Sequence, residues 1–216
     1  MKALIFGLAL SLIVPSLAAA LTQEETTAEF LRARESSTLA RKGDSGATER
    51  ALGQFAKLTE ANPQQPLFRA YYGSVYCIKA RDARFPFTKL SNVETGTDLI
   101  GKALAALTPD HDKELVGGVA VSLETRLVAA STFASIPKAF GRYQQAKDVL
   151  ADLLASPVFG SSPPAFQAAV YVQAAKIALK DEAAEPARAN LQKAVEVAPE
   201  SPAAEEARAL LTKPGA

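Results

Sequence analysis

The chain has 216 residues, of which 24 are Lys or Arg, 23 are Asp or Glu and one is His, so its formal net charge is +1. Hydrophobic residues make up 48% and charged residues 22%. This balance favours a folded domain with a core and excludes a disordered polyelectrolyte or a basic nucleic-acid-binding protein. One Cys and one His cannot form an internal disulfide or the usual zinc site, so we expect neither a metal nor a cofactor.

Residues 1–20 have the pattern of a signal peptide. A single Lys precedes an apolar run over residues 3–14, and small residues follow, with Ala18 and Ala20 in the arrangement that signal peptidase reads. The run is shorter than the ~20 residues of a membrane-spanning helix, which disfavours the alternative of an uncleaved anchor. We therefore predict cleavage near Ala20, a mature chain of residues 21–216 without a stable membrane span, and a periplasmic or secreted location in a bacterium.

The mature chain is predicted to be all-α, with about nine helices. Its apolar residues recur with the helical period and give no convincing period-two strand. Prolines fall between the periodic segments, where they end one helix or begin the next. The expected helices cover residues 22–35 with a Thr22–Glu25 capping box, 47–61, 66–80, 86–107 with a weak point near Gly96, 113–134, 137–155, 164–180, 182–198 and 202–211. A polar linker is expected at 36–46.

Two segments of the chain resemble each other. Residues 51–66, ALGQFAKLTEANPQQP, align with residues 187–202, ARANLQKAVEVAPESP, at a constant offset of 136 residues. Each has a small Ala, a large apolar residue four positions later, and a Pro that ends the helix. This spacing resembles the second helix of a tetratricopeptide repeat, whose period is 34 residues, so the offset suggests four repeats.

The resemblance implies one repeat domain over residues 21–216, in which antiparallel helix pairs stack as a right-handed α-solenoid. Residues 47–80 and 138–212 are most similar to the repeat, whereas residues 81–135 depart from it. Such repeats typically bind other proteins through a concave groove. The resemblance therefore implies a non-enzymatic scaffold with a protein or peptide partner in the cell envelope, and no nucleic acid.

The most unusual segment, KARDARFPFTKL at residues 79–90, interleaves cations with aromatic residues. Arginines beside aromatic rings can hold a carboxylate, a peptide terminus or a partner helix. In the alternative interpretation, Phe85 and Phe87 anchor the corner between two helices while Arg81 and Asp82 form a local ion pair. The candidate partner-binding residues are Arg69, Tyr72, Tyr76, Lys79, Arg81, Arg84, Phe85 and Phe87, with Arg126 as a further candidate.

Four acidic and basic residues near the middle have simpler interpretations. Asp110 or Asp112 is expected to cap the helix that we predict to begin at residue 113. Glu124 and Arg126 lie in an apolar helix and face different directions, so each is expected to pair with a charge on a neighbouring helix, unless one of them points into a groove.

Two other functions stay open. The irregular middle can enclose a pocket for a small molecule or for catalysis, with Cys77 as nucleophile and His111 as its base; apolar neighbours favour a buried, inert thiol instead. The protein can also be a structural subunit whose groove is filled by its own first helix, residues 22–35.

Overall fold

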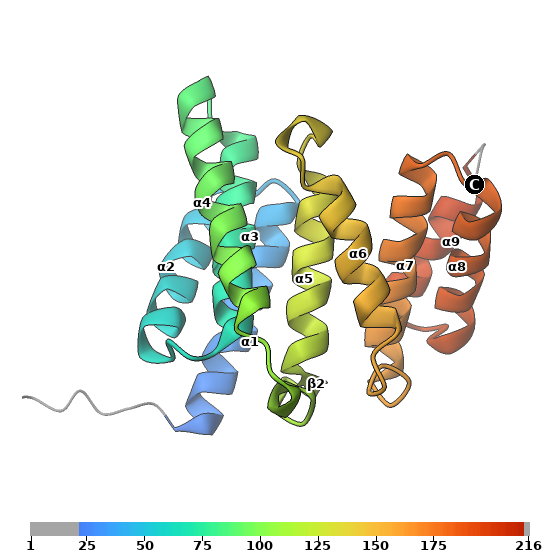
Figure 1. The fold of residues 1–216 in the computed structure, drawn as a ribbon, viewed down its shortest axis with the longest axis horizontal. Helices are drawn as coiled ribbons and strands as arrows, with labels where there is room; N and C mark the ends of the chain where they lie inside the picture. The colour runs from blue at the N-terminus through green and yellow to red at the C-terminus, as the bar shows by residue number, and fades with distance from the viewer. Residues whose placement is uncertain (1–21, 214–216) are drawn as a thin grey trace, which may run out of the picture.

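The computed structural model describes residues 22–213, and this part of the chain is all-α with nine α-helices, as predicted (Figure 1). The predicted signal peptide lies outside the described residues. The helices are α1 (Gln23–Arg41), α2 (Ser45–Ala61), α3 (Pro66–Asp82), α4 (Pro86–Ala105), α5 (Val121–Ser135), α6 (Tyr143–Leu154), α7 (Pro164–Lys180), α8 (Ala184–Val197) and α9 (Pro202–Leu211). Two short 3₁₀ helices, η1 (Pro109–Asp112) and η2 (Lys138–Phe140), and two strands, β1 (Leu115–Val116) and β2 (Val119–Ala120), lie between them.

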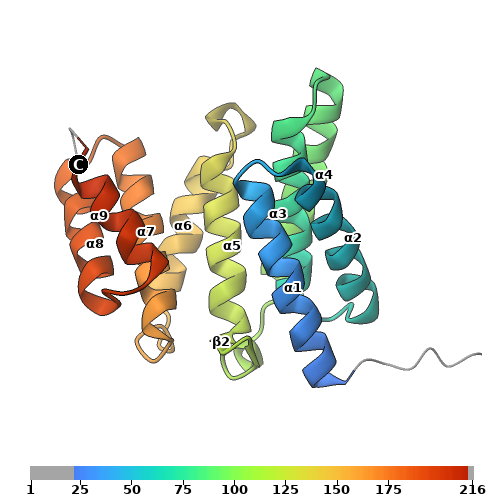
Figure 2. The ribbon, with the colours of Figure 1, turned by 180° about the vertical axis from the view of Figure 1, so that it is seen from behind.

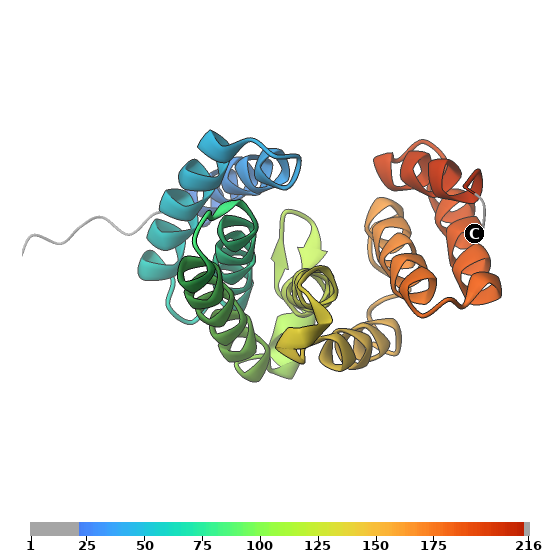
Figure 3. The same cartoon turned by 90° about the horizontal axis from the view of Figure 1, so that it is seen from above.

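Successive helices form antiparallel pairs that follow an open arc. The pairs are α1 with α2, α3 with α4, α5 with α6 and α7 with α8, and α9 packs on α7 and α8. Seen from above, the pairs run from α1–α4 through α5 and α6 to α7–α9 (Figure 3). Helices α1 and α9 lie on the same side of the molecule, at the two ends of the arc (Figure 2).

The two similar segments fall in α2 and α8, the second helices of the first and fourth pairs. Three steps along the arc separate them, so the offset of 136 residues does not count four periods of 34. Their matched side chains have the same role, because Ala51, Phe55 and Leu58 of α2 and Ala187, Leu191 and Ala194 of α8 are all buried.

The first helix is longer than predicted. Its capping box is present: Thr22 Oγ1 accepts a hydrogen bond from the Glu25 amide at 3.2 Å, and the Thr22 amide donates to the Glu25 carboxylate at 2.8 Å. The helix then continues to Arg41 through the predicted linker. Ser37 and Ala40 are fully buried there, because small side chains let α1 pack closely on its neighbours.

A β-hairpin replaces the predicted start of the helix at residue 113. Strands β1 and β2 pair antiparallel around Gly117 and Gly118, whose φ angles of 60° and 84° are in the left-handed region that suits glycine. Helix α5 therefore begins only at Val121. Instead of capping a helix at residue 113, Asp112 accepts a hydrogen bond from the Ser122 hydroxyl in the first turn of α5.

The predicted helix over residues 137–155 is likewise interrupted at its start. Gly141 has a φ angle of 69°, and it separates η2 from α6, which begins at Tyr143. A positive φ at this position ends the short 3₁₀ turn and redirects the chain into α6.

Helix α4 runs without a break through Gly96, where a weak point was predicted. A Cβ added to Gly96 would lie 2.5 Å from the carbonyl oxygen of Gly73, and one added to Gly73 would lie 2.5 Å from that of Gly96. The two glycines therefore let the backbones of α3 and α4 touch, and this contact sets how closely these two helices pack.

The core is divided along the arc. Aromatic side chains dominate the N-terminal part, around Phe30, Phe55, Phe68 and Tyr71. Helices α5, α6 and α7 share a second cluster that includes Phe133 and Leu153. The C-terminal cluster of α7, α8 and α9 is built mainly from small residues, namely Ala168, Val172, Ala175, Leu191, Ala194 and Ala207.

Candidate functional site

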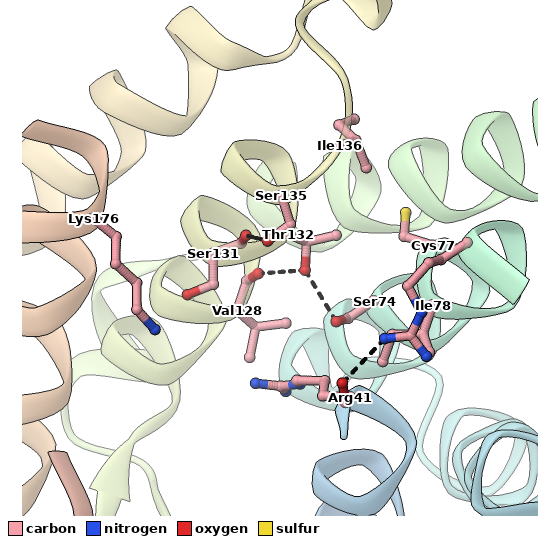
Figure 4. Close-up of a pocket in the computed structure, with 11 residues that line it drawn as sticks. Arg41, Ser74, Cys77, Ile78, Val128, Ser131, Thr132, Ser135, Ile136 and Lys176 are labelled. Carbon is pink, nitrogen blue, oxygen red and sulfur yellow. Dashed lines mark hydrogen bonds between the residues drawn. The ribbon is translucent and has the colours of Figure 1, made fainter. Parts of the chain in front are cut away.

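A cavity of about 340 Å³ opens inside the arc, between α1, α3, α5 and α7 (Figure 4). Its walls come from the first helix of each of the four antiparallel pairs. Helix α1 contributes its last residue, and α7 faces the others from across the cavity. The lining residues are Arg41, Ser74, Cys77, Ile78, Arg81, Val128, Ser131, Thr132, Ser135, Ile136 and Lys176.

Hydroxyl groups make one wall of the cavity polar. Thr132 Oγ1 lies 2.7 Å from the Val128 carbonyl oxygen, to which it donates, and 3.0 Å from Ser74 Oγ on the facing helix. Ser135 Oγ donates to the carbonyl oxygen of Ser131 at 2.6 Å. The side chains of Ser131 and Ser135 share one face of α5 because they are four residues apart, and both line the cavity.

Three cations surround this wall. Arg41 extends from the end of α1 into the cavity, and Lys176 approaches from α7 (Figure 4). Lys176 is also 2.6 Å from a carboxylate oxygen of Glu206 in α9. Asp and Glu are absent from the described residues that line the cavity, although Glu206 and Asp82 pair with two of its cations from outside the lining.

Arg81, the third cation, holds the fold together at the cavity edge. Its guanidinium donates to the carbonyl oxygens of Arg41 at 3.1 Å and Ala40 at 3.0 Å, which are at the C-terminal end of α1. It also pairs with Asp82 at 2.7 Å, and this hydrogen bond raises the pKa of Arg81. With these partners Arg81 positions α1 against α3. Arg41, and Lys176 in exchange for its pair with Glu206, are the cations that can meet a ligand.

A buried carboxylate lies on α5, one turn before Val128. Glu124 is 4% exposed; its Oε1 accepts from the Tyr71 hydroxyl at 2.6 Å and lies 3.4 Å from Arg34 Nη1 on α1. Its Oε2 has no hydrogen-bond partner in the described part of the chain. Burial raises the pKa of Glu124, and the contacts with Tyr71 and Arg34 partly offset this effect. The expected pairing of Glu124 with a neighbouring helix is therefore confirmed.

Of the predicted partner-binding residues in the described range, Arg81 alone lines the cavity. The side chains of Tyr72 and Tyr76 form another stripe of α3, where their hydroxyl oxygens are 3.2 Å apart. Lys79 follows on the same stripe and pairs with Glu49 of α2 at 3.1 Å. Arg69 Nη2 donates to the Pro63 carbonyl oxygen at 2.5 Å. Lys79 and Arg69 thus tie α3 to α2 and to the turn that joins the two helices, and none of these four residues lines the cavity.

The remaining candidates are also away from the cavity. Phe85 and Phe87 are 72% and 87% exposed, so the interpretation that they anchor a helix corner is wrong, although the Arg81–Asp82 ion pair is present. Arg84 is exposed beside them. Arg126 donates to the carbonyl oxygen of Ser122 within its own helix at 3.3 Å, and in the described part of the chain it does not form the expected ion pair with a neighbouring helix.

The residues considered for nucleophilic catalysis are at opposite ends of α5. Cys77 packs with Ile136, directly after the last turn of α5. His111 is in η1, where its Nδ1 bonds the Thr108 amide at 2.9 Å, and η1 contacts the first turn of α5 through Asp112. The 15 residues of α5 span roughly 20 Å. Burial raises the pKa of Cys77 to about 12, which keeps it a thiol at neutral pH.

Sequence reasoning missed most of the cavity residues, including Arg41 and Lys176. They are far apart in the chain and meet only through the curvature of the arc. The spacing of Ser131 and Ser135 was the one signal available, since residues four apart share a helix face.

The chain matches no protein-family model, and no match was found among the curated proteins or the solved structures. In residues 22–213, none of the helices has the length and apolar composition needed to cross a membrane. The same residues contain no group of three or more His, Cys, Asp or Glu side chains that could hold a metal ion.

Proposed function

We propose that the protein is a non-catalytic scaffold that binds an extended, acidic segment of a protein or peptide partner inside the arc. One observation carries this proposal: three cations and four hydroxyl-bearing side chains line the cavity, and Asp and Glu are absent from its described lining. Such a lining favours a ligand that brings its own carboxylate and has main-chain amides to hydrogen-bond.

The shape of the space favours an extended ligand. A second cavity of about 220 Å³ is lined by Ser135 and Lys176, which the first cavity also uses, and continues along α7 to Lys180. The two together form a groove with α7 on one side and α3 and α5 on the other. A peptide segment laid along this groove meets cations along its length, beginning with Arg41 and ending near Lys180.

The groove offers three kinds of contact. A ligand carboxylate between Arg41 and Lys176 gains charge-assisted hydrogen bonds, which are about twice as strong as neutral ones. Hydroxyls such as that of Ser131 can bond main-chain groups of the ligand. Val128, Ile78 and Ile136 provide apolar surface beside them.

The arrangement of the helices supports a tetratricopeptide-like, right-handed α-solenoid as part of the same proposal. The first helix of each pair lines the inside of the arc, and the second helices complete the pairs outside it. Stacked helix pairs with one concave surface are typical of proteins that bind other proteins. The signal-like pattern of residues 1–20 supports export, and we place the partner in the bacterial cell envelope.

The test is an affinity pull-down from cross-linked bacterial envelopes with the chain from residue 21. Replacing Ser131 and Ser135 by Glu places two negative charges in the groove, and the expected result is loss of at least about tenfold of the captured partner. Ala189→Glu, on the exposed side of α8, adds charge outside the groove and should leave capture unchanged. Equal capture by the groove variant and the control would contradict the proposal.

A small carboxylate-bearing metabolite is the second candidate ligand, because the cavity volume is at the lower end of the ~300–1,000 Å³ range of small-molecule sites. A thermal-shift screen of carboxylate metabolites distinguishes this small-molecule ligand from the peptide ligand. Stabilisation by one metabolite, lost in Arg41→Glu and accompanied by no captured protein, would favour the small molecule.

A further inference from the structure

The corner between α3 and α4 projects beyond the neighbouring helices (Figure 1). It carries three apolar side chains that the fold leaves in solvent: Phe85 is 72% exposed, Phe87 87% and Leu90 43%. Because isolated apolar residues are common on protein surfaces, one exposed Phe would need no explanation. Two largely exposed aromatic rings and a leucine within six residues instead form an apolar surface that calls for an explanation.

The local structure explains why these side chains are exposed. Phe85 is the N-cap of α4, and Pro86 fixes the first helical residue, so the phenyl rings stand on the first turn. Val93 is the first buried residue of α4, and residues 86–91 are all exposed. The contact between Gly73 and Gly96 holds the hairpin together further along α4, and the first two turns of this helix extend past that contact.

The charges of this corner are positive. Residues 83–91, which we call the tip, include Arg84 and Lys89 and no acidic residue. The acidic residue that precedes them, Asp82, is paired with Arg81 at 2.7 Å. Both cations of the tip are exposed beside the apolar side chains.

We propose that the tip binds the surface of an anionic lipid membrane. Phe85, Phe87 and Leu90 enter the boundary between headgroups and acyl chains, while Arg84 and Lys89 stay at the level of the lipid phosphates. A projecting apolar point flanked by cations matches a surface that can deform around it, whereas a protein partner would have to supply a matching pocket. The tip is separate from the groove, so this proposal does not depend on the ligand proposed there.

The test is flotation of the chain from residue 21, which contains all the described helices, with lipid vesicles. Vesicles of phosphatidylethanolamine and phosphatidylglycerol should carry the protein upward, and vesicles of phosphatidylcholine should carry much less. Replacing Phe85 and Phe87 by Ser should lower the fraction bound about tenfold or more. Replacing Arg84 and Lys89 by Gln should remove the preference for anionic vesicles and the loss of binding at high salt.

Leu115→Ser is the matched control. Leu115 is 57% exposed in the β-hairpin, so the variant removes an exposed apolar side chain from another part of the molecule and should bind like the original chain. All the variants change exposed residues, and circular dichroism before and after heating checks that each one folds. Failure of the unmodified chain to float, or equal flotation of the Phe variant, would overturn the proposal. Loss of a cross-linked protein from that variant without any vesicle binding would assign the tip to a protein partner instead.

Discussion

The two ends of the arc bury their helices by different means. The N-terminal part packs around large rings: Phe55 and Tyr71 are stacked with centroids 5.1 Å apart, and Phe30 meets Tyr71 edge-on at 5.4 Å. The C-terminal part packs α7, α8 and α9 through alanines around Leu191. A core of a few large side chains concentrates its stability in single residues, whereas a core of many small ones distributes it.

This difference bears on the groove, because its walls come from both ends. Helix α3 belongs to the aromatic part and α7 to the alanine-rich part. Behind this wall, and outside the lining of the groove, Glu124 of α5 is buried against Tyr71 of α3 and Arg34 of α1. A ligand in the groove therefore contacts two cores that respond differently to substitution.

The largest expected effect is loss of the aromatic core. Phe55→Ala should lower the free energy of unfolding by about 3–5 kcal/mol, because it removes a fully buried ring that contacts both Phe30 and Tyr71. Leu191→Ala, at the matched position of α8, should cost about 2–3 kcal/mol. Urea denaturation measures both values. A larger loss for Leu191→Ala than for Phe55→Ala would contradict the contrast between the two cores.

The next effect comes from the backbone contact of α3 and α4. Gly96→Ala should destabilise the protein by about 1–3 kcal/mol, since its Cβ would lie 2.5 Å from a carbonyl oxygen that cannot move freely. Gly101→Ala is the control in the same helix: its Cβ meets nothing within 4 Å, so the better helix propensity of Ala should stabilise by about 0.5–1 kcal/mol. The unfolding temperatures of the two variants should shift in opposite directions. A shift in the same direction would mean that the glycine contact does not determine how closely α3 and α4 pack.

A smaller effect is expected from the buried charge, and it depends on pH. Because burial raises the pKa of Glu124, the folded state holds a proton at pH values where the unfolded chain has lost it. The contribution of Glu124 is therefore most favourable below the unfolded pKa, and it is lost as pH rises through the folded pKa. Glu124→Gln keeps an acceptor for Tyr71 without this charge.

The stability of Glu124→Gln relative to the original chain should therefore be higher at pH 7 than at pH 4. Urea denaturation at the two pH values measures the difference. A relative stability that falls with rising pH would show that the pairing with Arg34 outweighs the burial of the carboxylate.

The sequence predicts the start of a helix best where the first helical residue is a proline. Pro66, Pro164 and Pro202 each begin a helix at the predicted residue. Errors occur where side-chain polarity or the spacing of apolar residues is misleading. Polar Ser37 is predicted to lie in a linker but is buried in α1, and strands of two residues each are too short to show period-two alternation. In the second case, the left-handed turn at Gly117 and Gly118 decides the structure.

The candidate site is harder to predict than the fold. The sequence marks residues 79–90 as unusual, but the exposure of Phe87 depends on how far α4 extends beyond its contact with α3. The groove depends on the curvature of the whole arc, which brings Arg41 and Lys176 to one cavity. Local sequence patterns carry no information about which residues, far apart in the chain, this curvature brings together.

The most direct test of the groove as a binding site is site-specific photo-cross-linking in the bacterial envelope. A benzoylphenylalanine at position 135, on the exposed edge of the groove, should capture one partner, and mass spectrometry should locate the cross-link in an acidic segment. Arg41→Glu should abolish this cross-link because it reverses a charge that the segment contacts. The same probe in place of Ala189 should capture nothing. Capture of the same partner from position 189, or a cross-link at position 135 that persists in Arg41→Glu, would contradict the account.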